Sequence, residues 1–459
     1  MNYKSLVGLP VSPIHVNLNK PVGAFEWWRH TISHGGINNL PLPEAVASGA
    51  RRLKPRLLRT FIQEYFNIYP EHGVYDWSKL DPYMESLHST GADVVASICF
   101  KPPLLFPVID SAIWRPNNLT EWQRLISELV KRYSIDKKIV SYWEIGNETD
   151  FGETGGCPYL ITDPQDYYDY YVFTQEAILE AWPEAKVGGP AAGDFNHPLL
   201  EGFIQLCMAN RTRLDFVSWH IYSDHPKDHA LRVRQAKEWL APFGEVRPEM
   251  LITEWNKSFE SLPLEEMELS PRKAAFTAAA LLAYMEEGGD WTFYYHVWDQ
   301  LFYPSQFKSF YKDLPIMIEH WNEAPHRFGL FGVSGEIRAP YFVYLMMSRM
   351  GDLRVETVAE QRDLRAVTVR RPGVITIMLV NYNPNEAADC IAVTHLQGLS
   401  EGAKRLEVFR LDESRTWDEK SLELLPVESR LIDTIDGYAF KLNLWCPGDS
   451  VCWAVLTDL

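Results

Sequence analysis

Short apolar runs rich in β-branched residues alternate with longer amphipathic segments through most of this chain. Residues 92–100 (ADVVASICF) are typical of a buried strand, and residues 120–133 (TEWQRLISELVKRY) carry apolar side chains at helical spacing behind the capping residue Thr120. Repeated strand-then-helix units indicate a parallel sheet. With a strand expected near residues 24–34, the count reaches eight, which predicts an α/β fold, a (β/α)8 TIM barrel over residues 21–350.

The same alternation gives the other expected elements. The strands are expected at residues 56–61, 139–145, 185–189, 214–221, 250–255 and 291–298, and helices at residues 77–90, 164–182, 197–210, 227–240 and 338–350. A further helix should begin at Ser270-Pro271, which offer a cap and a proline at the first helical position, and end at Gly288-Gly289. A doubly wound open sheet is the alternative, but no GxGxxG follows the first strand and no P-loop is present.

The character of the sequence changes after Gly351. Helical spacing stops, and short alternating runs follow, among them AVTVRR, VITIMLVNYN, RLEVFRL and SVCWAVL. These runs predict an accessory C-terminal antiparallel β-sandwich domain over residues 351–459. Residues 1–20 contain the β-rich run VSPIHVNLN, which we expect to add a strand to this sandwich.

Composition and charge exclude several classes of function. Hydrophobic residues make up 46% of the 459 residues, which excludes a disordered chain, and no apolar run is long enough for a membrane span. The net charge of −17 repels phosphate backbones and anionic lipids, so we expect no nucleic acid and no membrane as partners, while a homo-oligomer stays open. The six cysteines form no CxxC and the first residues lack a signal peptide's apolar core, so we expect a reducing, cytoplasmic location.

Polar residues at the ends of the expected strands are candidates for chemistry, because barrel enzymes carry their active sites at that end. The fourth strand runs into Asn147 and Glu148, and the seventh strand carries Glu254. Two carboxylates that face one cavity suit cleavage of a glycosidic bond, since one protonates the leaving oxygen and the other attacks the sugar or activates water. Arg59, near the end of the second strand, is the cation expected to keep one carboxylate ionised.

Other polar residues have a structural as well as a functional interpretation. Glu144 lies in the body of the fourth strand and is the residue most easily confused with Glu148. Residues 152–157, directly after that strand, fit either a loop on the substrate side or a connector. A cluster that can ligate metal follows the sixth strand: His220, Asp224, His225 and His229. Its spacing matches no known zinc signature, so we expect no metal and no other cofactor.

Several stretches together resemble one group of enzymes. Asn147-Glu148 and Glu254 resemble the acid/base and nucleophile motifs of glycoside hydrolase clan A, the retaining (β/α)8 glycosidases. Within the clan, residues 21–350 are most similar to family thirty-nine, the β-xylosidase and α-L-iduronidase family, through the stretches FEWWRHTISHGG, LLRTFIQEYFNIY, DFVSWHIYS, ITEWN and HRFGLFGVSGEIRAPYFVYLMM. The resemblance implies that Glu148 is the general acid/base and Glu254 the nucleophile. It also implies substrate-binding roles for Arg59, Phe100, Asn147, His220, Tyr222 and Trp298, with core packing as the alternative for the two aromatic residues.

Two departures from the family pattern bear on specificity. The fourth strand ends in Ile-Gly-Asn-Glu-Thr, closer to family fifty-one, the α-L-arabinofuranosidases, and Thr60-Phe61 replace the family's histidine after Arg59. We expect a retaining exo-glycosidase that hydrolyses terminal sugars of oligosaccharides or glycosides and resembles β-xylosidases. An α-L-arabinofuranosidase or another clan A specificity is the alternative. A non-catalytic carbohydrate-binding barrel is the alternative of another class, and the presence of both carboxylates counts against it.

Overall fold

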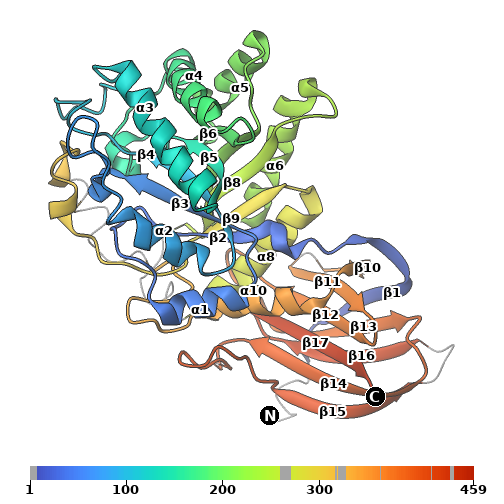
Figure 1. Ribbon diagram of the computed structural model, residues 1–459. Helices are drawn as coiled ribbons and strands as arrows, with labels where there is room; N and C mark the ends of the chain where they lie inside the picture. Colours follow the sequence, from blue (N-terminus) through green and yellow to red (C-terminus); the bar gives the residue numbers. More distant parts are fainter. Residues whose placement is uncertain are drawn as a thin grey trace.

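A computed structural model gives the fold of the chain and describes residues 8–258, 270–315, 318, 327–361, 363–414, 416–434 and 439–459. Eight parallel strands close into a barrel (Figure 1), which confirms the predicted (β/α)8 architecture. The barrel strands are β2 (His30–Ser33), β3 (Leu57–Gln63), β4 (Asp93–Cys99), β5 (Val140–Ile145), β6 (Lys186–Ala192), β7 (Phe216–Tyr222), β8 (Glu249–Asn256) and β9 (Trp291–Tyr295). Every residue of β3 is buried, as expected for a parallel strand covered on both faces.

Helices surround the barrel: α1 (Glu44–Arg52), α2 (Leu80–His88), α3 (Leu119–Val130), α4 (Pro164–Ala181), α5 (Pro198–Asn210), α6 (Pro226–Leu240), α8 (Pro271–Glu287) and α10 (Ala339–Met350). The predicted bounds of α8 are confirmed. The hydroxyl of Ser270 accepts a hydrogen bond from the backbone N–H of Arg272, and Pro271 stands in the first turn. Gly288 ends the helix at φ +71°, a left-handed conformation that favours glycine.

Two helices differ from their predicted bounds by more than one residue. Helix α2 begins at Leu80, three residues after the expected start at residue 77. Helix α3 ends at Val130 and continues as a π-helical turn over Lys131–Asp136. Within this wider turn the hydroxyl of Ser134 donates to the carbonyl of Val140 and accepts from the indole of Trp143, so contacts with β5 stabilise it.

The C-terminal strands form one nine-stranded sheet together with β1 (Val11–Ala24). These strands are β10 (Leu353–Ala359), β11 (Leu364–Arg371), β12 (Val374–Asn381), β13 (Cys390–Gln397), β14 (Gly402–Leu411), β15 (Glu428–Thr434), β16 (Phe440–Cys446) and β17 (Ser450–Asp458). Ile14, Leu379 and Leu444 come from strands well separated in the sheet and share one apolar core, so the sheet curls over itself. The division of the chain into domains at residues 350 and 351 stays a prediction.

Strand β1 corrects the expectation of a purely antiparallel sandwich. It lies between β10 and β13, antiparallel to β10 and parallel to β13, so the sheet is mixed. Along its first half, Ile14, Val16 and Leu18 are buried at alternating positions and enter the core of the sheet. This inner position gives β1 hydrogen-bonding partners on both sides.

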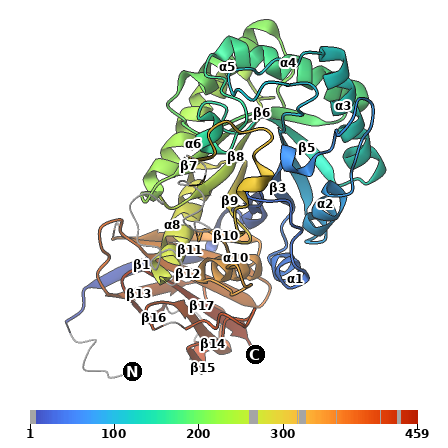
Figure 2. The same cartoon turned by 90° about the vertical axis from the view of Figure 1, so that its left-hand side faces the viewer.

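Helices α8 and α10 lie between the barrel and the sheet (Figure 1). At the start of α8, the guanidinium of Arg272 donates to the carbonyls of Asn383 and Pro384, and the ring of Phe276 packs edge-on against Tyr382. The sheet therefore lies beside the barrel, and the loops that follow the barrel strands face the viewer in Figure 2. None of the helices in the described part of the chain has the length and apolar character that crossing a membrane requires.

Candidate active site

The body of β3 and the ends of β5, β7 and β8 bring together six of the polar side chains expected at the site. Since β1 belongs to the other sheet, the fourth and seventh barrel strands are β5 and β8. Hydrogen bonds and one 3.7 Å contact between His220 and Glu254 join all six into one cluster: Arg59, Asn147, Glu148, His220, Tyr222 and Glu254.

Arg59 is the centre of this cluster. Its side chain is fully buried; Nη1 donates to Oε1 of Glu254 and Nη2 to Oδ1 of Asn147, each over 2.7 Å. Nε donates to Oε2 of Glu144 over 2.8 Å. Burial alone would lower the pKa of Arg59, but the carboxylates of Glu144 and Glu254 have a larger effect and raise this pKa above its usual value. A stable positive charge therefore lies against Glu254.

Glu254 accepts a hydrogen bond at each of its carboxylate oxygens. Oε1 is bonded by Arg59, and Oε2 accepts the hydroxyl of Tyr222 over 2.6 Å. Burial raises the pKa of Glu254 above its usual value, while the charge of Arg59 and both hydrogen bonds oppose that rise. These partners favour the ionised form, which attack on a sugar carbon requires.

Glu148 has different surroundings. Burial, the charge of Glu254 and the charge of Asp150 raise the pKa of Glu148 well above its usual value, and Arg59 opposes this only in part. The protonated form, which a general acid needs, is therefore favoured. The backbone of Glu148 has φ +43°, in the left-handed region, and its N–H donates to the carbonyl of Ala191 over 2.9 Å.

Two glycines leave the space that the Glu148 side chain occupies. A Cβ on Gly155 would lie 2.3 Å from Oε2 of Glu148, and a Cβ on Gly193 would lie 3.2 Å from its carboxyl carbon. Asn147 holds the first of these glycines in place, because its Nδ2 donates to the carbonyl of Gly155 over 3.3 Å. The loop of residues 152–157 is therefore packed against the candidate acid/base, and its place on the substrate side stays a prediction.

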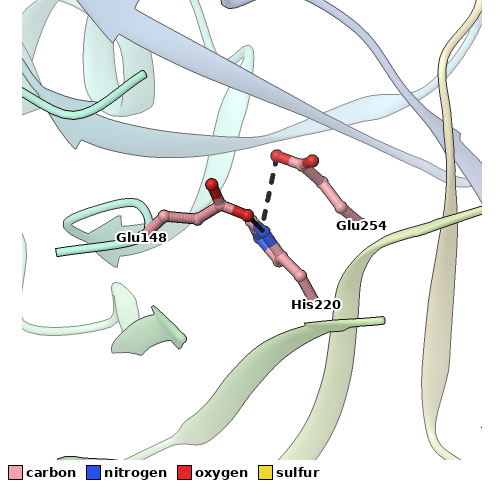
Figure 3. Close-up of side chains that lie close together, drawn as sticks. All are labelled: Glu148, His220 and Glu254. Carbon is pink, nitrogen blue, oxygen red and sulfur yellow. Dashed lines mark hydrogen bonds and ion pairs between the residues drawn. The ribbon is translucent and has the colours of Figure 1, made fainter. Parts of the chain in front are cut away.

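His220 lies between the two carboxylates (Figure 3). Its Nδ1 is 2.7 Å from Oε1 of Glu148, and its Nε2 is 3.7 Å from Oε1 of Glu254. Burial and the charge of Arg59 hold the pKa of His220 well below its usual value. A neutral imidazole thus separates the carboxylates and adds no positive charge to the site.

The geometry of the carboxylates and His220 also bears on metal binding. One ligand atom from each of Glu148, His220 and Glu254 lies within 4.8 Å of the other two, a spacing that can hold a cation. The guanidinium of Arg59 already bonds Glu254 and would repel a cation there. His229, from the histidine cluster in the sequence, bonds the hydroxyl of Tyr284 and the carbonyl of Ser223 instead.

The two aromatic candidates lie outside this cluster. Phe100 is fully buried, and the centroid of its ring lies 5.3 Å from that of Trp122 on α3, which favours the alternative of core packing over a wall of the sugar site. Trp298 keeps 9% of its surface exposed and donates its indole N–H to the carbonyl of Val333. Its ring lies 6.2 Å from that of His34.

Sequence reasoning missed His34, although it lies in the quoted FEWWRHTISHGG stretch. His34 follows β2, is fully buried, and has no hydrogen-bond partner at either ring nitrogen within the described residues. A buried imidazole of this kind is suited to bind a sugar hydroxyl. The signal in the sequence was a histidine at the end of a predicted barrel strand.

Comparisons with known proteins identify the family of the chain. Residues 55–370 match the model of "Glycosyl hydrolases family 39". The chain is 24% identical over 395 residues to a β-xylosidase of Geobacillus stearothermophilus, covering 77% of this chain and 73% of that protein.

Solved structures share the fold over almost the whole length. A family 39 enzyme from Xanthomonas axonopodis pv. citri superimposes with a TM-score of 0.75 at 15% identity, covering 100% of this chain and 99% of the other. A monomeric β-xylosidase from Caulobacter crescentus gives a TM-score of 0.74 at 18% identity, covering 97% and 99%. With the family match extending over most of the barrel, the chain belongs to glycosyl hydrolase family 39 and is a glycoside hydrolase.

Proposed function

We propose that this protein is a retaining exo-glycosidase with β-xylosidase-like specificity, in which Glu254 is the nucleophile and Glu148 the general acid/base. The observation that carries the proposal is the unequal environment of the two carboxylates. Glu254 accepts hydrogen bonds from Arg59 and Tyr222, whereas Glu148 contacts a neutral His220 and feels the negative charge of Glu254. The pair is thus prepared with one charged and one protonated member.

In the first step, the Glu254 carboxylate attacks the anomeric carbon while Glu148 gives its proton to the departing oxygen. Loss of that proton makes Glu148 a base, which then takes a proton from the water that attacks the glycosyl-enzyme. Asn147 has its Oδ1 bonded to Arg59 and one amide hydrogen directed to Gly155, so the second amide hydrogen can bond the sugar 2-hydroxyl.

The short separation of the carboxylates supports retention of configuration. Oxygens of Glu148 and Glu254 lie within 4.8 Å of each other. Retaining pairs stand about 5–5.5 Å apart, whereas inverting pairs leave about 6.5–9.5 Å for a water molecule. NMR of the first anomer formed tests this point: the product should have the anomeric configuration of the substrate, and the opposite anomer would contradict the assignment of Glu254.

A contact across the mouth of the barrel supports exo action. Glu153, after β5, accepts the backbone N–H groups of Lys312 and Asp313, each over 2.8 Å. The segment with those two residues follows β9, which is four strands away from β5 and therefore on the opposite side of the barrel. It crosses in front of the opening, where it is yellow-orange in Figure 2. A mouth closed on one side suits removal of terminal sugars.

The sugar is proposed from the relatives. The curated relative from Geobacillus stearothermophilus and the structure from Caulobacter crescentus are both β-xylosidases. A panel of nitrophenyl glycosides, covering both anomers of xylose, arabinose, glucose and iduronic acid, tests the choice. Highest kcat/KM on the β-xyloside is expected. Preference for the α-L-arabinofuranoside would replace the proposed specificity, and binding without any turnover would favour a carbohydrate-binding protein.

A further inference from the structure

The loops beside Glu148 carry a group of exposed apolar side chains that the proposed reaction does not use. Phe151, three residues after Glu148, is 45% exposed, and Leu160 is 40% exposed. The loop after β4 adds three more exposed apolar residues: Val108, Ile109 and Ile113. Exposed apolar side chains that gather in one region mark a binding site more often than single ones do.

Phe151 lies directly beside the candidate acid/base. A Cβ on Gly193 would lie 2.5 Å from Cε2 of the Phe151 ring and 3.2 Å from the carboxyl carbon of Glu148, so ring and carboxyl group are neighbours above this glycine. Leu160 continues the apolar surface, because its side chain packs on Gly152, the residue next to Phe151. A Cβ added to Gly152 would lie 3.3 Å from the Cβ of Leu160.

The two loops form one surface. The backbone N–H of Leu160 donates to the carbonyl of Ser111 over 2.8 Å, and Nζ of Lys101 bonds the carbonyls of both Asp110 and Pro158. Two charged groups of this region already have partners, because Lys101 bonds these carbonyls and Glu153 binds two backbone N–H groups with its two carboxylate oxygens. The exposed apolar side chains of the two loops therefore offer an apolar surface to a ligand.

We propose that Phe151 and Leu160 form a binding site for an apolar aglycone, the alkyl or aryl group that leaves with the glycosidic oxygen. The proposal rests on the proposed function, because a general acid stands on the leaving-group side of the bond it cleaves. A group attached to the oxygen protonated by Glu148 lies next to the Phe151 ring. Alkyl and aryl glycosides are thus the substrate class that this face recognises, in preference to glycosides whose second group is a sugar.

The test is a series of methyl, butyl and hexyl β-D-xylosides, whose alcohol leaving groups have nearly equal acidity. In the wild type, kcat/KM should rise at least about tenfold from methyl to hexyl, since each fully buried methylene contributes a factor of about four. Phe151→Ser and Leu160→Ser should each reduce the hexyl-to-methyl ratio severalfold. Phe151→Leu, which stays apolar, should keep most of it.

Val246→Ser is the matched control, because Val246 is 91% exposed and lies before β8, at the other end of the barrel. It should leave both kcat/KM values unchanged. A flat alkyl series in the wild type, or an unchanged ratio in Phe151→Ser, would overturn the proposal. If no glycoside is hydrolysed at all, the proposed function fails. In that case, calorimetry of hexyl and methyl β-D-xyloside binding to the same proteins tests the apolar site. The ratio of the hexyl to the methyl association constant should be high in the wild type and reduced in Phe151→Ser and Leu160→Ser.

Discussion

Tyr222 on β7 donates its hydroxyl to Oε2 of Glu254 on the neighbouring strand β8 over 2.6 Å. Burial raises the pKa of Tyr222 well above its usual value, so this hydroxyl stays a donor at all working pH values. The hydrogen bond favours the ionised Glu254, and its loss should raise the pKa of that carboxyl.

The pH profile of kcat/KM should be bell-shaped, rising as Glu254 ionises and falling as Glu148 loses its proton. Both limbs should lie above the pH at which ordinary glutamates titrate, because the pKa is raised for both carboxyls. In Tyr222→Phe the acid limb should move up by about one pH unit, while Tyr142→Phe, which removes a similar bond to Glu249 at the opposite end of the barrel, should not move it. An unshifted acid limb in Tyr222→Phe would contradict the role of this bond.

Glu148→Ala and Glu254→Ala should fail in different ways. Glu254→Ala removes the nucleophile and should lower kcat by about 10⁴-fold or more for every leaving group. In Glu148→Ala, kcat/KM should fall about 10²–10⁴-fold on poor leaving groups and little on activated phenols, for which slow deglycosylation should give a burst followed by slow turnover. Azide should restore turnover of Glu148→Ala with retention and give the inverted glycosyl azide with Glu254→Ala. Equal loss on good and poor leaving groups in Glu148→Ala would exclude it as the acid.

Glu144→Ala is expected to act on stability and not to create a leaving-group dependence. Glu144 and Arg59 form an ion pair with both side chains fully buried. Removal of one partner leaves a buried charge and should cost about 3–5 kcal/mol of unfolding free energy, measured by denaturant titration. An azide-rescued burst in this variant, in place of Glu148→Ala, would move the acid/base role to Glu144.

Gly155→Ala should displace the acid/base without changing its chemistry. The added methyl group would lie 2.3 Å from Oε2 and 2.8 Å from Cβ of Glu148. A shift of this carboxyl by about 1 Å should lower kcat on poor leaving groups by about 10²-fold. Gly289→Ala is the control, since its Cβ would meet other atoms only at 3.6 Å and beyond, and it should keep full activity. Full activity of both variants would show that Glu148 tolerates the methyl group.

Glu64 should make the free energy of unfolding depend on pH. The side chain is buried, its Oε2 has no hydrogen-bond partner among the described residues, and burial raises its pKa to about 8. The folded state thus keeps a proton that the unfolded state releases, so stability falls as pH rises from about 4.5 to 8. Glu64→Gln should be more stable than wild type by about 4 kcal/mol at pH 8 and equal to it at pH 4.5. Thermal unfolding at both values, with the exposed Glu71→Gln as control, checks this.

The sequence was informative wherever one physical signal dominates. Apolar strands that alternate with capped helices predicted the barrel, and carboxylates at strand ends identified Glu148 and Glu254 as candidates. The environment of Phe100 was not predictable, because an aromatic residue after a strand looks the same whether it faces the mouth or packs on α3. His34 was missed because a single imidazole follows no periodicity, and its lack of partners is visible only when the neighbouring strands are in place.

The C-terminal strands were predicted, but their order in the sheet was not. Alternating runs show that strands are present, but they do not show which strands are neighbours, because side-chain periodicity is the same in every pairing. The parallel pairing of β1 with β13 joins residues from opposite ends of the sequence, such as Ser12 and Ala392. Local patterns carry no information on such contacts.

The inner position of β1 sets an order of events for a chain that emerges from the ribosome. Its hydrogen-bonding partners, β10 and β13, are synthesised only after the whole barrel. Until then both edges of β1 are open to pairing with other chains, a hazard that grows with the time spent waiting. Pairing between such distant segments also closes a very long loop, which slows folding. The interval before this sheet is complete is therefore the time at which a newly made molecule is exposed to aggregation through β1.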